Sequence, residues 1–293
     1  MHFTGRTWRP PYEANSCIIQ LTSGCTYGKC RFCNLYKDEP FCLSPLSEFE
    51  EDLAEIKRYQ PGARRIFLTG ANPFALSYKK LKPYVLTVRD YLIKCQTIAM
   101  FASIRDIKNK EVWQLKKLRA MGVNGLSIGT ESGDDDTLAL ANKGYTSQDI
   151  IEQCRKLDEA GIEYYFVYMA GLAGAGGGYR NAMNSAKVFC QLNPYFIYVD
   201  ALTLFPETEL YMLAKEGKYI PAGEKERLLE MQVFIKNLQI RTHLFANTVS
   251  NFYPVSAYLP KEREKVVAEL QQVMDTFSEE EMQEYRSGLK SLG

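Results

Sequence analysis

Apolar segments typical of β-strands alternate with amphipathic segments typical of α-helices through the first 216 residues of this chain. The expected strands are 17–22, 65–69, 97–103, 125–129, 163–169 and 196–202. The expected helices are 46–59, 77–94, 109–121, 134–141, 147–160 and 178–192. This alternation predicts an α/β fold with a parallel sheet, because parallel neighbouring strands need a crossover connection, which is usually a helix. A partial barrel of six strand–helix units and an open doubly wound sheet both satisfy the pattern, and it does not separate them.

The pattern changes after residue 216. Residues 218–223 are rich in turn formers, and we expect helices over 224–238 and 261–277. Residues 240–258 mix Asn, Ser and aromatic side chains, and we expect irregular structure there. The sequence therefore predicts two domains, with the α/β core over 1–216 and a mostly helical extension over 217–293 that covers the mouth of the core.

The balance of charges argues against a nucleic-acid-binding protein. The chain has 36 basic and 35 acidic residues, and a net charge of +1 gives no global electrostatic footprint for nucleic acid. The first 16 residues lack the apolar run of a signal peptide, and no segment approaches the length that spans a bilayer. We expect a cytoplasmic protein that binds neither nucleic acid nor membrane.

Three of the eight cysteines cluster in one short loop, with the spacing Cys-x4-Cys-x2-Cys. These are Cys25, Cys30 and Cys33, and the loop follows the first expected strand. Thiolates at this spacing can bind three irons of a cubane iron–sulfur cluster, whereas most electron-transfer clusters take four cysteines. Three protein ligands would leave one iron open, which chemistry at a metal requires.

A structural zinc site is the alternative for this loop, and it would need a fourth ligand nearby. The only histidines, His2 and His243, are distant in sequence. Cys42 is the nearest further cysteine, and it lies beyond Pro40. We therefore expect iron–sulfur chemistry and interpret Cys42 as a small buried apolar residue.

The loop resembles the cluster loop of radical S-adenosylmethionine (radical SAM) enzymes, near the HemN/Elp3-like group. Those enzymes commonly carry Cys-x3-Cys-x-aromatic-Cys after the first strand; here the first gap is one residue longer, and Phe32 fills the aromatic position. The resemblance extends over residues 15–215. It implies a partial (β/α)6 TIM-like barrel, a [4Fe-4S] cluster on Cys25, Cys30 and Cys33, and S-adenosylmethionine on the open iron.

Segments after the second and fourth strands resemble the family's S-adenosylmethionine contacts. Gly70, Ala71 and Asn72 stand where the family usually has Gly-Gly-Glu, whose backbone holds the methionine amino group. Glu131 stands where a carboxylate accepts hydrogen bonds from the ribose hydroxyls, a role that suits an acceptor-only group. The alternatives from the residues alone are a strand-ending turn at 70–72 and a helix N-terminal charge at Glu131.

The resemblance assigns the remaining contacts to loops after the third, fifth and sixth strands. It implies that Ser103 and Arg105 meet the methionine carboxylate, which an arginine can bind bidentately. It places Gly171 against the adenine, and gives Phe205 and Thr208 backbone hydrogen bonds to the same base. A surface ion pair at Arg105, a flexible loop at Gly171 and a helix start capped by Thr208 are the alternatives.

The chemistry that the resemblance implies is reductive cleavage of S-adenosylmethionine to a 5′-deoxyadenosyl radical, which abstracts hydrogen from a substrate. It also implies a low-potential electron donor, either flavodoxin or ferredoxin. We expect a small-molecule substrate, and no residue identifies it or any catalytic side chain beyond the cluster ligands. The alternatives are a tRNA-modifying radical SAM enzyme and a non-enzymatic iron–sulfur electron-transfer protein, which would need a fourth protein ligand.

Overall fold

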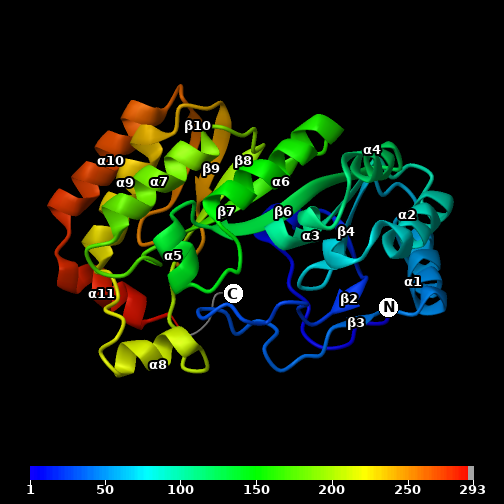
Figure 1. Ribbon diagram of the computed structural model, residues 1–293, viewed down its shortest axis with the longest axis horizontal. Helices are drawn as coiled ribbons and strands as arrows, with labels where there is room; N and C mark the ends of the chain where they lie inside the picture. The colour runs from blue at the N-terminus through cyan, green and yellow to red at the C-terminus, as the bar shows by residue number, and fades with distance from the viewer. Residues whose placement is uncertain (290–293) are drawn as a thin grey trace. The chain divides into compact units, whose positions relative to one another are not determined.

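The computed structural model describes residues 1–289, which divide into two compact units (Figure 1). Unit 1 comprises residues 1–28, 35–128 and 152–164. Unit 2 comprises residues 29–34 and 129–151 and the chain from residue 165 on. The predicted division at residue 216 stays a prediction, and residues 290–293 of the predicted extension lie outside the described residues.

Unit 1 is built on parallel strands. They are β1 (Cys17–Gln20), β4 (Arg65–Thr69), β5 (Thr97–Ala102) and most of β6 (Val123–Glu131). They pair in the order β1-β4-β5-β6, so each strand lies next to its successor in this series. A short antiparallel pair, β2 (Thr22–Ser23) with β3 (Cys42–Leu43), closes the segment that carries the first cysteine of the loop.

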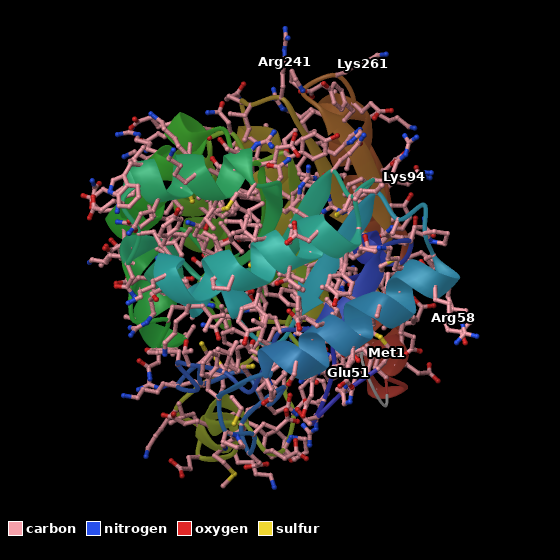
Figure 2. All side chains as sticks on the ribbon, turned by 90° about the vertical axis from the view of Figure 1, so that its right-hand side faces the viewer. Met1, Glu51, Arg58, Lys94, Arg241 and Lys261 are labelled. Atoms are coloured by element: carbon pink, nitrogen blue, oxygen red, sulfur yellow. The ribbon has the colours of Figure 1, made fainter. Side chains whose placement is uncertain are left out.

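The helices of unit 1 connect these strands. They are α1 (Leu46–Tyr59), α2 (Tyr78–Tyr91), α3 (Ile104–Lys108), α4 (Val112–Ala120) and the larger part of α6 (Ser147–Ala160), with short 3-10 turns η1 (Pro11–Glu13) and η2 (Pro73–Ala75). In α1, Phe49, Leu53 and Ile56 are buried at helical spacing. The charged side chains of Glu51 and Arg58 are exposed on the same helix, as Figure 2 shows.

Unit 2 continues the strand series with β7 (Tyr164–Ala170), β8 (Phe196–Ala201), β9 (Thr242–Ala246) and β10 (Val255–Leu259). Its helices are α5 (Asp135–Leu140), α7 (Gly178–Phe189), α8 (Glu209–Lys215), α9 (Glu224–Asn237), α10 (Arg263–Thr276) and α11 (Glu279–Ser287). In Figure 1, α7, α9 and α10 lie side by side, in agreement with their contacts. The full strand order is β1-β4-β5-β6-β7-β8-β9-β10, which confirms the predicted α/β class.

The two faces of β7 have different neighbours. Phe166 contacts Phe189 of α7, and Tyr168 stacks on Phe234 of α9, so this face meets the helices. Met169 points to the opposite face and is paired in register with Asp200 of β8. Asp200 therefore lies on the face of the sheet turned away from the helices.

The prediction of irregular structure over 240–258 is wrong. The segment forms β9 and β10, an antiparallel pair, and β9 is parallel to β8. Buried and more exposed residues do alternate in both strands, with patterns typical of a half-buried sheet. Each strand is only five residues long, and the mixed polar and aromatic residues 247–254 between them hide the alternation. The short helices α3 and α11 were also not predicted.

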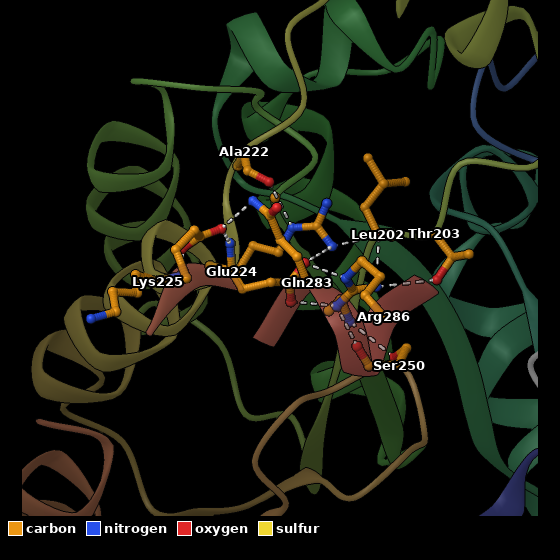
Figure 3. A network of polar contacts seen from close by, with 12 residues as sticks. Leu202, Thr203, Ala222, Glu224, Lys225, Ser250, Gln283 and Arg286 are labelled. Atoms are coloured by element: carbon orange, nitrogen blue, oxygen red, sulfur yellow. Dashed lines mark hydrogen bonds and ion pairs between the residues drawn. The ribbon is translucent and has the colours of Figure 1, made fainter. Parts of the chain in front are cut away.

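A buried ion network fixes the last helix to the loops after β8 and β9 (Figure 3). Arg286 of α11 pairs with the Glu224 carboxylate and donates to the carbonyl oxygen of Ser250 at 2.7 Å. Arg227 lies 3.2 Å from the same carboxylate and donates to the carbonyl oxygen of Leu202 at 2.9 Å. The last helix is thus held by a paired charge and by backbone carbonyl groups of two loops.

Among residues 1–289, no helix is long and apolar enough to cross a membrane.

Candidate functional site

The first thiol of the cysteine loop is held by a turn in unit 1. Cys25 is partly exposed, and its Sγ accepts the N–H of Gly28 at 3.4 Å. Gly24 has φ of 63°, and a Cβ there would lie 2.4 Å from the carbonyl oxygen of Pro40. The turn before Cys25 therefore requires glycine, both for its left-handed backbone and for this close approach.

The other two thiols of the loop belong to unit 2. Cys30 and Cys33 are partly exposed, and the N–H of Cys33 donates to the carbonyl oxygen of Cys30 at 3.3 Å. Between them, Arg31 donates its N–H to the carbonyl oxygen of Ala141 at 3.0 Å and pairs its Nε with Glu209 at 2.8 Å. This segment is therefore anchored to the end of α5 and the start of α8.

None of the three thiols of the loop forms a disulfide. Among residues 1–289, no group of three His, Cys, Asp or Glu side chains is already gathered as a metal site. The assignment of Cys25, Cys30 and Cys33 as metal ligands therefore rests on their spacing and stays a prediction.

Glu131 has an unusual backbone and a buried carboxylate. Its φ is 62°, a left-handed conformation that non-glycine residues seldom adopt, at the end of β6. Its Oε1 lies 3.3 Å from Nζ of Lys143, while its Oε2 is buried and has no hydrogen-bond partner. A Cβ at Gly129 would lie 2.5 Å from Oε1, so Gly129 leaves the space that this carboxylate occupies. The arrangement presents one acceptor oxygen that lacks a donor.

Lys143 is a buried cation beside the predicted site residues. Its ammonium lies 5.6 Å from the ring centroid of Phe32. Burial disfavours the charge, but electrostatic interactions with Tyr145, Cys30 and Glu131 outweigh this and raise the pKa of Lys143 well above its ordinary value. The side chain therefore stays charged, and it interacts both with Cys30, a predicted cluster ligand, and with Glu131, the residue predicted to bind the ribose.

Asn72 makes hydrogen bonds with two other loops of unit 1. Its Nδ2 donates to Oγ1 of Thr26 at 2.5 Å and to the carboxylate of Asp106 at 3.1 Å, while its Oδ1 accepts the N–H of Thr26 at 3.2 Å. Asp106 in turn accepts the N–H of Ser103 at 2.8 Å and completes a capping box at the start of α3. The side chain of Asn72 is thus occupied within the protein, and the hydroxyl of Ser103 accepts the N–H of Arg105 at 3.4 Å.

The other predicted contacts of unit 1 lie in the same loops. Gly70 has φ of 134°, and a Cβ there would lie 2.2 Å from Oγ1 of Thr22, so this position requires glycine. Ala71 follows it and is partly exposed. Arg105 is exposed, and its guanidinium lies 4.4 Å from the ring centroid of Tyr27 in the cysteine loop. Their contacts with S-adenosylmethionine stay predictions.

Gly171 is held by residues from the chain beyond 216. Its N–H donates to Oε2 of Glu230 at 2.8 Å, and its carbonyl oxygen accepts the hydroxyl of Tyr219 at 2.8 Å. Its φ is 83°, and a Cβ would lie 2.9 Å from Nε of Arg227. Both polar groups of its backbone are therefore used within unit 2, and a contact with adenine would have to use its apolar surface.

Glu230 gives the protein a predicted pH dependence. Burial raises the pKa of its carboxyl from 4.5 to about 7, against the hydrogen bonds from Tyr168, Gly171 and Asn181. Because the folded pKa is the higher one, the free energy of unfolding is greatest below pH 4.5 as far as this group is concerned, and falls as the pH rises through 7. The loss is about 3 kcal/mol. Chemical denaturation at pH 5 and pH 8 should show this difference in the free energy of unfolding, and Glu230→Gln should reduce the difference. An equal difference between the two pH values in both proteins would contradict the prediction.

Phe205 and Thr208 form the start of α8. Thr208 caps the helix by accepting the N–H of Tyr211 at 3.2 Å, and its hydroxyl donates to the carbonyl oxygen of Phe205 at 2.7 Å. The helix start that the residues alone suggested is therefore confirmed. Backbone hydrogen bonds from this turn to adenine stay a prediction.

Sequence reasoning missed two charged residues near Glu131. Lys143 belongs to no motif in the sequence, and only its burial marks it out. Asp200 accepts the hydroxyl of Thr248 at 2.7 Å, and burial, with the charge of Glu131, raises the pKa of Asp200 to about 6. One signal was present, because Asp200 is the only charged residue in the apolar segment 196–202.

Comparison with known protein families gives one match for this chain. The sequence model of the Radical SAM superfamily matches residues 19–175. This segment includes the cysteine loop, Asn72, Glu131 and Lys143.

Two curated relatives show moderate similarity. The heme chaperone HemW of Bacillus subtilis is 25% identical over 232 residues, which are 76% of this chain and 60% of the relative. A tRNA uridine(34) acetyltransferase of Methanocaldococcus infernus is 27% identical over 126 residues, which are 41% of this chain and 22% of the relative. The chain thus spans less than two thirds of the length of either protein.

Solved structures share the fold at low identity. Coproporphyrinogen III oxidase (HemN) from Escherichia coli has a TM-score of 0.56 and 17% identity, over 76% of this chain and 52% of the other. The radical S-adenosylmethionine methyltransferase TsrM from Kitasatospora setae has a TM-score of 0.56 and 18% identity, over 68% and 39%. Methylornithine synthase (PylB) has a TM-score of 0.51 and 14% identity, over 92% and 85%. The likeness confirms the partial barrel rather than the open doubly wound sheet.

Proposed function

Because the chain belongs to the Radical SAM superfamily, whose sequence model matches more than half of it, we propose that it is an enzyme that cleaves S-adenosylmethionine reductively. Cys25, Cys30 and Cys33 would hold a [4Fe-4S] cluster with one open iron. When bound and reduced, the cluster supplies the electron that splits the sulfonium into methionine and a 5′-deoxyadenosyl radical, which takes hydrogen from the substrate. A flavodoxin or ferredoxin would deliver that electron.

The donor set of the loop fits such a cluster. Thiolates are the ligands that iron–sulfur clusters take in proteins, and the three cysteines of the loop are partly exposed and form no disulfide. The ammonium of Lys143 interacts electrostatically with Cys30, so it would stabilise the negative charge of a thiolate bound there to iron. Three thiolates leave a coordination position for the amino and carboxylate groups of S-adenosylmethionine.

The single observation that carries the proposal is the free oxygen of Glu131. A buried carboxylate oxygen without a donor is costly, and a left-handed backbone at a non-glycine residue adds to that cost. Hydrogen bonds from the two ribose hydroxyls of S-adenosylmethionine would satisfy it. The chain's own residues thus keep one acceptor in place for the ligand, with Lys143 fixing the other oxygen.

The test is to reconstitute the protein anaerobically with iron and sulfide, reduce it with dithionite, and add S-adenosylmethionine. We expect 5′-deoxyadenosine, and we expect Glu131→Gln to raise the Kd for S-adenosylmethionine by roughly tenfold or more, because a charged hydrogen bond is lost. Glu216→Gln is the matched control, since Glu216 is exposed and pairs only with Lys218 among the interactions of the described residues. No 5′-deoxyadenosine from a fully reduced cluster would favour an iron–sulfur electron-transfer protein instead.

We also propose a small-molecule substrate and a location in the cytoplasm. The net charge of +1 supports a small molecule over tRNA, although one relative carries a tRNA-related name. The names of HemW and HemN add tetrapyrroles to the compounds worth testing. Bulk tRNA that bound with a steep dependence on salt would overturn the small-molecule proposal.

A further inference from the structure

One side chain in unit 1 ties the cysteine loop to the ends of two strands. Asn72 follows β4, and it exchanges hydrogen bonds with both the backbone and the side chain of Thr26, the residue after Cys25. Asn72 is buried, whereas Thr26 is exposed. The buried amide therefore forms hydrogen bonds with the exposed loop at the residue next to a predicted cluster ligand.

The orientation of this amide is fixed from the other side. The carboxylate of Asp106 accepts from Nδ2 of Asn72 at 3.1 and 3.2 Å, and it is itself held by the N–H of Ser103. Lys110 is fully buried below, and its ammonium donates to the carbonyl oxygen of Asp106 at 3.2 Å. A connected chain of groups thus runs from the start of α3 through Asn72 to Thr26.

We propose that Asn72 is a positioning residue that holds Cys25 in place for the cluster, rather than a direct ligand of S-adenosylmethionine. This rests on the proposed function, because it assumes that Cys25 binds the cluster. The amide donates through Nδ2 to both Thr26 and Asp106 and accepts through Oδ1, so its polar atoms are already engaged.

The chemistry of the position explains why an amide is needed there. Radical SAM enzymes usually carry a glutamate at this position. An ionised glutamate or aspartate there could only accept hydrogen bonds, and it would face the carboxylate of Asp106. Two ionised carboxylates would repel each other, and neither of them could donate a hydrogen bond to Oγ1 of Thr26. The amide side chain both donates to Asp106 and holds the loop.

The experiment compares Thr26→Val with Thr26→Ser in the full chain, reconstituted with iron and sulfide. Serine keeps the hydroxyl that Asn72 donates to, and valine removes it while keeping the shape. We expect the valine protein to lose iron to the chelator bathophenanthroline roughly five- to tenfold faster than wild type, and the serine protein to stay within about twofold. The electron paramagnetic resonance lines of the reduced cluster should broaden in the valine protein only. Thr26 is exposed, so both variants should fold with the wild-type Tm.

Asn72→Asp is the second variant, with Asn124→Asp as its matched control. Asn124 is also a buried asparagine of unit 1 that donates to a carboxylate, that of Glu163, at 2.8 Å. Both aspartate variants should lower the Tm of the cluster-free protein, but only Asn72→Asp should speed the loss of iron. Equal rates of iron loss in the valine, serine and wild-type proteins would overturn the inference alone. A wild-type protein that takes up no cluster would overturn the proposed function, and the inference with it.

Discussion

Cys30→Ala is expected to abolish formation of 5′-deoxyadenosine from S-adenosylmethionine, with a loss of about a thousandfold or more. Two thiolates cannot hold a site-differentiated cubane, and Cys30 is also the cysteine that interacts electrostatically with Lys143. The measurement is 5′-deoxyadenosine per reduced protein, with iron content determined on the same sample. Both quantities should fall together.

Cys42→Ala is the matched control for this experiment. Cys42 is an exposed cysteine in β3, so its interpretation as a small buried apolar residue is wrong. It is the residue that a four-cysteine cluster would have to recruit first. We expect its removal to leave iron content and activity at the wild-type level. Iron content that fell in Cys42→Ala as far as in Cys30→Ala would show a fourth protein ligand, and the electron-transfer alternative would then be the better account.

The elements that could be predicted from sequence are those with a strong local period. The bounds of α1, β4 and α6 match the expected ranges, because their apolar residues repeat at helical or strand spacing over the whole element. The strands β9 and β10 were not predicted, since five residues give too few repeats of the strand pattern to stand out beside their neighbours. Their place in the sheet depends on pairing with β8, a contact between distant segments.

The candidate site divides along the same line. The spacing of three cysteines and the motif at the end of β6 are local patterns, so the sequence could point to Cys25, Cys30, Cys33 and Glu131. The roles of Asn72 and Lys143 depend on partners 46 and 12 residues away in the chain. No local sequence pattern indicates which carboxylate pairs with the ammonium of Lys143, or which loop forms hydrogen bonds with the amide of Asn72.

Lys143→Met is expected to destabilise the protein and to weaken S-adenosylmethionine binding. The methionine would fill a similar volume, but it would leave the buried carboxylate of Glu131 without its cation, since both side chains are only 9% exposed. Removing one partner of a buried pair costs about 3–5 kcal/mol, whereas an exposed pair contributes only about 0–1 kcal/mol. Lys116→Met provides the matched control, because Lys116 pairs with Glu159 at 2.9 Å with both side chains more than half exposed. Denaturant unfolding of the two cluster-free variants measures the loss of stability in each.

The double variant Lys143→Met/Glu131→Gln decides whether the loss comes from the pair itself. A neutral amide beside methionine leaves no unpaired charge, so we expect the double variant to recover most of the stability that Lys143→Met loses. It should nevertheless bind S-adenosylmethionine at least as weakly as Glu131→Gln, because the carboxylate that would accept the ribose hydroxyls is gone. Additive losses of stability in the double variant would mean that Lys143 acts through other neighbours, with Cys30 the first to test because it also interacts electrostatically with the ammonium.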